Sequence, residues 1–146
     1  MNGTFTFVPS ADELAAIFAH AAAPAFLLAG VGGFVSVLLS RLNMIVDRLR
    51  HLSEIDAEDP ARASQRTAIP VLKRRGVLLH QAAYLTLTAG ISTTLLLVLS
   101  VAAAFFRWNH FFGGVALFGV ATALLTAALF RFAQEVKLAQ HEMEGY

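Results

Sequence analysis

Three long runs without a charged side chain divide the chain. They cover Leu14 to Ser40, Gly76 to Phe106 and Trp108 to Phe130. Each run exceeds the roughly 20 apolar residues that a helix needs to cross the hydrocarbon core of a bilayer. The pattern predicts an all-α, integral membrane three-helix bundle with spans at about 14–40, 76–106 and 111–132. Only Arg107 to His110 separate the last two spans, so these helices are expected to form a tight antiparallel hairpin.

The apolar periodicity continues past the end of the first span. A heptad-like seam with spacings of 4, 3, 4 and 3 is formed by Leu38, Leu42, Ile45, Leu49 and Leu52. It predicts that the first helix extends to about Leu52. Pro70 suits the first turn of the second helix, and the apolar spacing in the tail, 133–146, extends the third. A cytoplasmic helical loop, 41–75, therefore belongs to the same single domain, 1–146, and its seam should pack on the other extensions or on a second subunit.

A second stripe on the first helix combines small and polar side chains. It starts at Ala22, ends at Asp47, and includes Ala29, Gly33, Ser36, Ser40 and Asn43. Ser36 and Leu38 are roughly 200° apart around a helix, so this stripe faces away from the leucine seam. Two interpretations stay open. The stripe is a helix–helix contact, since small residues let helices approach closely in lipid, or it lines a water-filled path in an assembly of several copies.

The other two spans carry fewer distinctive side chains. Gln81 and Tyr84 are intramembrane polar residues of the second span, and Gln81 is predicted to point into the bundle because an amide facing lipid is costly. In the first span, Pro24 predicts a kink or a change of direction. A packing surface is expected on the third span from Ala116, Gly119, Ala123 and Ala127.

The basic residues indicate an orientation. Eight of the eleven Lys and Arg residues lie between Arg41 and Arg75. Short loops rich in Lys and Arg stay in the cytoplasm, so the N-terminus is predicted outside and the C-terminus inside. Within the cluster, Asp47 is expected to pair with Lys73, Arg74 or Arg75 and to join the two helical extensions. The remaining arginines, including Arg48 and Arg50, can meet anionic lipid headgroups, each worth about 1 kcal/mol near the surface.

Composition narrows the class of protein. The chain is 57% apolar with a mean hydropathy of +0.64, as expected for a small bundle in lipid. Its net charge of +1 provides no global field to attract nucleic acid. With no cysteine, disulfides and Cys-ligated metals are excluded. The sequence has no Gly-rich phosphate loop, no His pair at ligand spacing and no nucleophile elbow. We therefore expect neither an enzyme nor a bound cofactor.

Two segments of the chain resemble a known family. One runs from Ser40 to Arg50 (SRLNMIVDRLR), and the other from Ile69 to Arg75 (IPVLKRR) leads directly into an apolar span. Both are similar to the bacterial membrane family catalogued as domain of unknown function 2721, and the likeness covers roughly Leu14 to Gln140. The resemblance implies about three spans in a bacterial inner membrane. It implies signature positions at Arg41, Asp47, Arg48, Arg50, Arg74 and Arg75, and it supplies no mechanism.

The leading functional hypothesis is a non-enzymatic, homo-oligomeric inner-membrane protein. The small stripe on the first span would lie nearest the oligomer axis, which makes a small channel or pore one form of this hypothesis. The alternative is a membrane scaffold or regulatory subunit that binds a protein partner or anionic lipid through its basic cytoplasmic helices.

Overall fold

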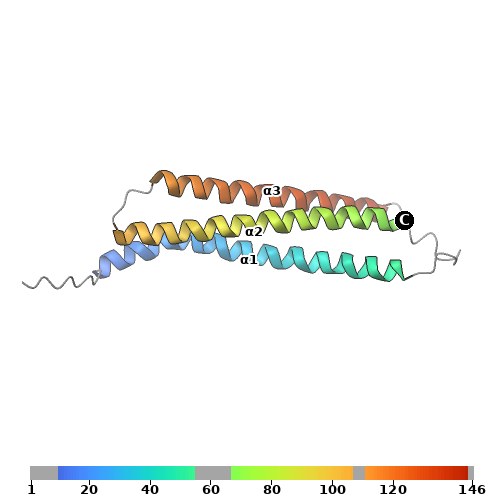
Figure 1. Ribbon diagram of the computed structural model, residues 1–146, viewed down its shortest axis with the longest axis horizontal. Helices are drawn as coiled ribbons and strands as arrows, with labels where there is room; N and C mark the ends of the chain where they lie inside the picture. Colours follow the sequence, from blue (N-terminus) through green and yellow to red (C-terminus); the bar gives the residue numbers. More distant parts are fainter. Residues whose placement is uncertain (1–9, 55–66, 107–110, 145–146) are drawn as a thin grey trace, which may run out of the picture.

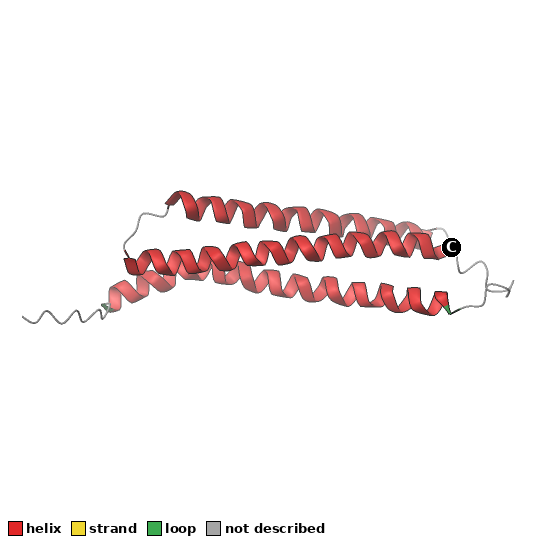
Figure 2. Cartoon of the chain, viewed as in Figure 1, coloured by secondary structure: helices red, strands yellow, loops and turns green. Residues whose placement is uncertain are grey.

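The chain forms three long helices and no strand among the residues described, with a short 3₁₀ segment at 67–68 leading into the second helix. The computed structural model describes residues 10–54, 67–106 and 111–144. The helices are α1 (Ala11–Ser53), α2 (Ile69–Phe106) and α3 (Phe111–Glu144), and each is long and apolar enough to cross a membrane. The all-α prediction is therefore confirmed (Figure 2). Residues 55–66 of the loop between the first two helices, and the hairpin tip at 107–110, lie outside the described residues.

The three helices form a layer with α2 in the middle (Figure 1). α2 packs along both α1 and α3, whereas α1 and α3 approach each other at few points among the described residues. Successive helices run antiparallel in Figure 1, as the short connection between α2 and α3 predicts for that pair. This arrangement brings the end of α1, the start of α2 and the end of α3 to one end of the molecule.

Both ends of α1 agree with the sequence pattern. At its start, the Ser10 hydroxyl accepts a hydrogen bond from the Glu13 N–H, and the Glu13 carboxylate accepts one from the Ser10 N–H. This capping box satisfies two of the backbone donors that a helix start leaves free. The helix then continues unbroken to Ser53. Pro24 lies buried inside it, and α1 changes direction along its blue part in Figure 1, as the proline predicts.

Large side chains of α1 pack on small residues of α2. Val31, Leu38 and Ile45 recur every seven residues on α1 and are buried. A Cβ atom placed on Gly90 of α2 would lie 3.1 Å from Val31 Cγ1, and one placed on Gly76 would lie 3.7 Å from Ile45 Cγ2. The contact at Gly76 is an ordinary van der Waals distance, whereas a Cβ atom on Gly90 would crowd Val31, so the glycine at 90 lets the two helices approach closely.

Alanines line the contact between α2 and α3. They follow a seven-residue repeat, at Ala82, Ala89 and Ala103 on α2, where Leu96 takes the intervening position, and at Ala121 and Ala128 on α3, and all are buried. Buried threonines beside them need no partner on another helix. The Thr86 and Thr93 hydroxyls donate to backbone carbonyls four residues earlier, at 2.7 and 2.8 Å.

The leucine seam is covered within the chain itself. Leu38, Ile45 and Leu52 are buried in one apolar cluster together with Leu72 and Leu79 of α2. The seam therefore packs on a neighbouring extension, which is one of the two coverings that its periodicity predicts. The extensions of α1 and α2 beyond the apolar runs thus continue the packing of the spans.

Candidate functional site: a charge cluster at the membrane boundary

Three charged residues stand where the apolar runs end. Arg41 is the first charged residue after the uncharged run of α1, Arg75 is the last before that of α2, and Glu135 follows that of α3. Because the helices alternate in direction, as Figure 1 shows, these three positions come to a similar level along the layer, where their side chains make ion pairs. That level corresponds to the boundary between hydrocarbon and headgroups.

The three side chains meet around a fully buried carboxylate. The Glu135 side chain is 0% exposed, against 14% for Arg75 and 31% for Arg41. Arg75 donates from both Nε and Nη2 to Glu135 Oε1, at 3.0 and 2.9 Å. Arg41 Nη1 lies 3.6 Å from the other carboxylate oxygen, Oε2, which is an ion pair but too long for a hydrogen bond. Glu135 therefore holds α2 firmly and α1 weakly.

Two aromatic rings complete the contact between α1 and α3. The Arg41 guanidinium lies over the Phe132 ring, with Cζ 5.3 Å from the ring centroid. Phe34, seven residues before Arg41, packs edge-on against the same ring at 5.6 Å and 81°. Both geometries are favourable, since a ring presents a negative face to a cation and to the edge of another ring. Side chains thus connect α1 to α3 here, although their backbones otherwise touch little.

The cluster is not electrically balanced. Two arginines and one glutamate give it a formal charge of +1, and Glu135 Oε2 has no hydrogen-bond donor among the described residues. Buried carboxylate oxygens usually have such a donor. The ion pairs can join the three helices. The guanidinium of Arg41, which has the longer contact, keeps a positive charge that is only weakly paired.

Glu135 is absent from the site residues that the sequence suggests. Two signals in the sequence point to it. No Asp or Glu occurs between Asp59 and Glu135, and Glu135 continues the seven-residue repeat of Ala121 and Ala128. Its partner Arg75 likewise stands seven residues before Ala82. The ion pair thus occupies one more layer of the alanine-lined contact between α2 and α3.

The prediction that Asp47 joins the extensions is wrong. Within the described part of the chain, no ion pair connects Asp47 with Lys73, Arg74 or Arg75, and Asp47 is exposed. The reason is the direction in which Asp47 points around the axis of α1. Ile45 faces the core, and Asp47 lies two residues, or roughly 200°, further around α1. Of the predicted cytoplasmic charge cluster, the structure brings together Arg41 and Arg75, whereas the others are exposed, namely Arg48, Arg50, Lys73 and Arg74.

The expectation for Gln81 is wrong, and the packing surface expected on α3 makes no contact within the described chain. Gln81 does not point into the bundle, since it and Tyr84 are exposed on α2 while Ala82 and Ala83 are buried. The predicted packing surface of α3 is also exposed, at Ala116, Gly119, Ala123 and Ala127. The neighbouring alanine repeat of α3 makes the contact with α2 instead. On α2 the smaller residues, Ala82 and Ala83, occupy the buried positions.

The small stripe of α1 is entirely on the outside of the chain. Its predicted members are all exposed, namely Ala29, Gly33, Ser36, Ser40 and Asn43. A Cβ atom on Gly33 would meet nothing within 4 Å. The Ser36 hydroxyl donates to the Gly32 carbonyl at 3.1 Å, so its donor is already used within the helix. The stripe therefore makes no helix contact inside the described chain.

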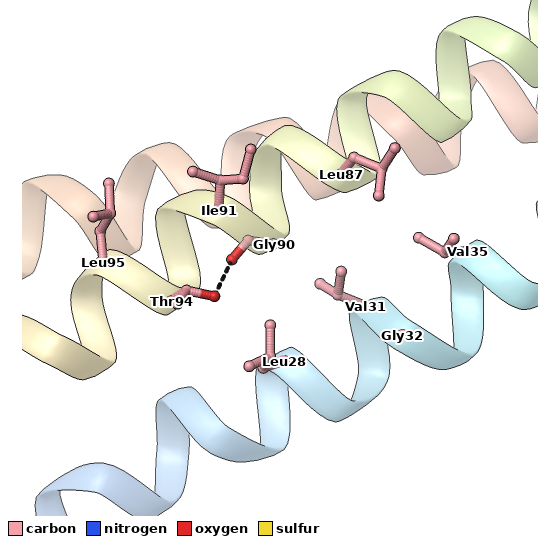
Figure 3. A pocket seen from close by; sticks show the side chains of 9 residues that line it. All are labelled: Leu28, Val31, Gly32, Val35, Leu87, Gly90, Ile91, Thr94 and Leu95. Atoms are coloured by element: carbon pink, nitrogen blue, oxygen red, sulfur yellow. Dashed lines mark hydrogen bonds between the residues drawn. The ribbon is translucent and has the colours of Figure 1, made fainter.

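An apolar groove of about 540 Å³ lies between α1 and α2 (Figure 3). Leu28, Val31 and Val35 of α1 point toward α2 in this view, and Leu87 and Ile91 of α2 also line the groove. Its one hydroxyl, on Thr94, donates to the Gly90 carbonyl at 2.9 Å. The groove thus offers no polar group for chemistry. Nor does the described part of the chain contain a group of three His, Asp or Glu residues that could hold a metal ion.

Comparison with known proteins agrees with the architecture. No curated protein and no solved structure matches the chain. A family model described as a protein of unknown function, DUF2721, matches residues 21–144, a range that contains the charge cluster and nearly all of the three helices. The chain is therefore a three-helix protein with membrane-spanning character that belongs to the DUF2721 family.

Proposed function

We propose that the protein is a non-enzymatic, homo-oligomeric protein of the bacterial inner membrane in which α1 forms the contact between subunits. The observation that carries this proposal is the outward position of the small stripe, directly opposite the face of α1 that packs on α2. Glycine inside a helix costs about 1 kcal/mol relative to alanine. Gly30, Gly32 and Gly33 meet no neighbour within 4 Å, so three glycines without an explanation inside the chain gather in one turn of α1, whereas Gly119 stands alone on α3. Close approach of a second helix in lipid would explain this group.

Replacing Gly33 with leucine is expected to weaken association at least about tenfold, which corresponds to about 1.4 kcal/mol. The new side chain would hold two α1 helices apart without touching its own chain. The measurement is the apparent mass in mild detergent over a range of protein-to-detergent ratios. Gly119→Leu is the matched control, because a side chain there on α3 also meets nothing within 4 Å. A wild-type monomer, or dissociation by Gly119→Leu alone, would contradict the proposal.

A pore along the oligomer axis is a second candidate. It is favoured by Ser36, Ser40 and Asn43, whose polar side chains are exposed on one line of α1. The hydrogen bond of Ser36 to its own backbone favours simple packing instead. For this reason we place assembly ahead of conduction.

Cysteine accessibility separates the two candidates. If a pore exists, polar thiol reagents should modify cysteines at Ser36 and Ser40 but not one at Leu39, whose exposed side chain lies off the stripe. A cysteine at Leu38 reports only on the α1–α2 contact, because Leu38 is fully buried. Protection at all positions would leave a packed oligomer without a pore.

The basic residues support an orientation with the N-terminus outside and the C-terminus inside. They concentrate at the end of the layer that carries Arg41 and Arg75. An alkaline phosphatase fused at the N-terminus should be active, and one fused after Glu144 should be inactive. The reverse pattern would show the opposite orientation.

A protein that is monomeric in lipid would favour the alternative function, that of a membrane scaffold or regulatory subunit. The exposed cations of the extensions, such as Arg48 and Arg74, would then present a surface for a regulated partner protein. Co-purification of one partner that is lost on replacing both arginines would support this role.

A further inference from the structure

The guanidinium of Arg41 has N–H donors that no described residue of the chain accepts. A guanidinium has five N–H donors. The structure gives Arg41 an ion pair of 3.6 Å and a position over the Phe132 ring, and no hydrogen bond to any described residue. About two thirds of the side chain is nonetheless shielded. Shielded donors without acceptors are costly, so an acceptor from outside the chain would stabilise this arrangement.

The position of Arg41 indicates where that acceptor comes from. Arg41 directly follows the uncharged run that ends at Ser40, at the edge of the hydrocarbon core. Lipid phosphates lie immediately outside that edge. The flexible stem of arginine packs on apolar surface while its head reaches the interface.

The charge of the cluster indicates the kind of acceptor. Arg75 directs two N–H groups at Glu135 Oε1, and only the long contact to Oε2 remains for Arg41. The guanidinium of Arg41 is a cation whose carboxylate contact to Glu135 is 3.6 Å long, and one monoanionic phosphodiester would pair with it more closely. A zwitterionic headgroup would bring a second cation with its phosphate. Arg48 lies seven residues after Arg41 on the same side of α1, and its exposed cation adds to the attraction.

From these contacts we infer that Arg41 binds the phosphate of an anionic phospholipid at the membrane boundary. The planar guanidinium matches two phosphate oxygens at once. Phe132 holds one face of it, so its free N–H edge is oriented before the lipid arrives. Glu135 anchors the cluster through Arg75 and does not compete strongly for Arg41. This site does not depend on the oligomer proposed above.

The test measures lipid binding to the full chain. Wild-type protein in neutral detergent is titrated with phosphatidylglycerol or phosphatidylcholine, and bound lipid is counted by native mass spectrometry. We expect phosphatidylglycerol to bind about tenfold more tightly. Arg41→Gln should remove most of that preference, whereas Arg41→Lys, which keeps the charge without the planar fork, should retain about a third of it.

Arg74→Gln is the matched control. It removes the same charge from an exposed position on α2 and should change the preference less than twofold. Equal losses in both variants would show a general charge effect and overturn the assignment to Arg41. A wild-type protein without any preference would overturn it as well.

Two further measurements keep the inference testable. If Arg41→Gln misfolds, as judged by helix content and elution, Phe132→Leu keeps every charge and should still lower the preference several-fold. Inorganic phosphate at millimolar concentration should not displace the lipid. Full displacement would show a site for soluble phosphate and overturn the headgroup assignment.

Discussion

Glu135→Gln is expected to destabilise the folded protein by about 3 kcal/mol. Glutamine keeps the shape of the side chain, so the effect reports the lost charge. Removing one partner of a buried ion pair typically costs 3–5 kcal/mol, because the other charge stays buried. Arg75 is only 14% exposed and would lose its carboxylate, whereas Arg41 at 31% can turn toward water, which places the loss at the lower end. Reversible unfolding in mixed detergent, followed by circular dichroism, measures it.

A double variant and a control test the cause of that loss. Replacing both Arg75 and Glu135 with methionine should recover most of the stability, since apolar residues of similar volume often substitute for a buried pair without loss. Asp47→Asn makes the same change of charge at an exposed position and should stay within about 0.5 kcal/mol. A loss below about 1 kcal/mol for Glu135→Gln would show that the cluster contributes little to stability.

Gly90→Leu is expected to separate α1 from α2 and to destabilise the protein by about 3 kcal/mol, at the upper end of the range for overpacking. Even a Cβ atom there would lie 3.1 Å from Val31 Cγ1, and leucine adds three more carbons. Unfolding in mixed detergent measures the loss. The same change at Gly119, where a Cβ atom meets nothing within 4 Å, should fall within about 0.5 kcal/mol.

A double variant at Gly90 and Val31 gives a stricter test of the contact between α1 and α2. Gly90→Ala alone forces Val31 to move by a few tenths of an ångström. Adding Val31→Ala removes the crowding atom, so the double variant should be more stable than the sum of the two single losses predicts. Simple additivity would show that Gly90 and Val31 are not coupled, and the tight α1–α2 contact would lose its support.

The sequence predicts the helices well because their signals are local. Uncharged runs set the spans, and the spacing of Leu38, Ile45 and Leu52 sets how far α1 continues. Each signal lies within a few turns of one helix. The seven-residue spacing also identifies which face of α1 is buried.

The site is predicted less well because it depends on how separate helices are rotated and aligned. Arg75 and Glu135 are 60 positions apart in the sequence. Nearness in the chain favours Asp47 as the partner of Arg75, yet the rotation of α1 turns Asp47 outward. For Gln81 the cost of exposing an amide to lipid is weaker than the demand for small residues at the α2 contacts. The repeat that contains Ala121, Ala128 and Glu135 is the signal that links the acid to the core.

The buried ion pair also has a consequence for biosynthesis. Arg41 and Arg75 precede Glu135 in the chain, so both arginines are made before the carboxylate that later faces them. While the first two spans insert, neither arginine is paired with Glu135, so both positive charges can act as orientation signals. Acidic residues contribute little to such signals. Once α3 is in place, Glu135 offsets one of the two charges. In the orientation proposed above, two residues that direct insertion would thereby also hold the finished protein together.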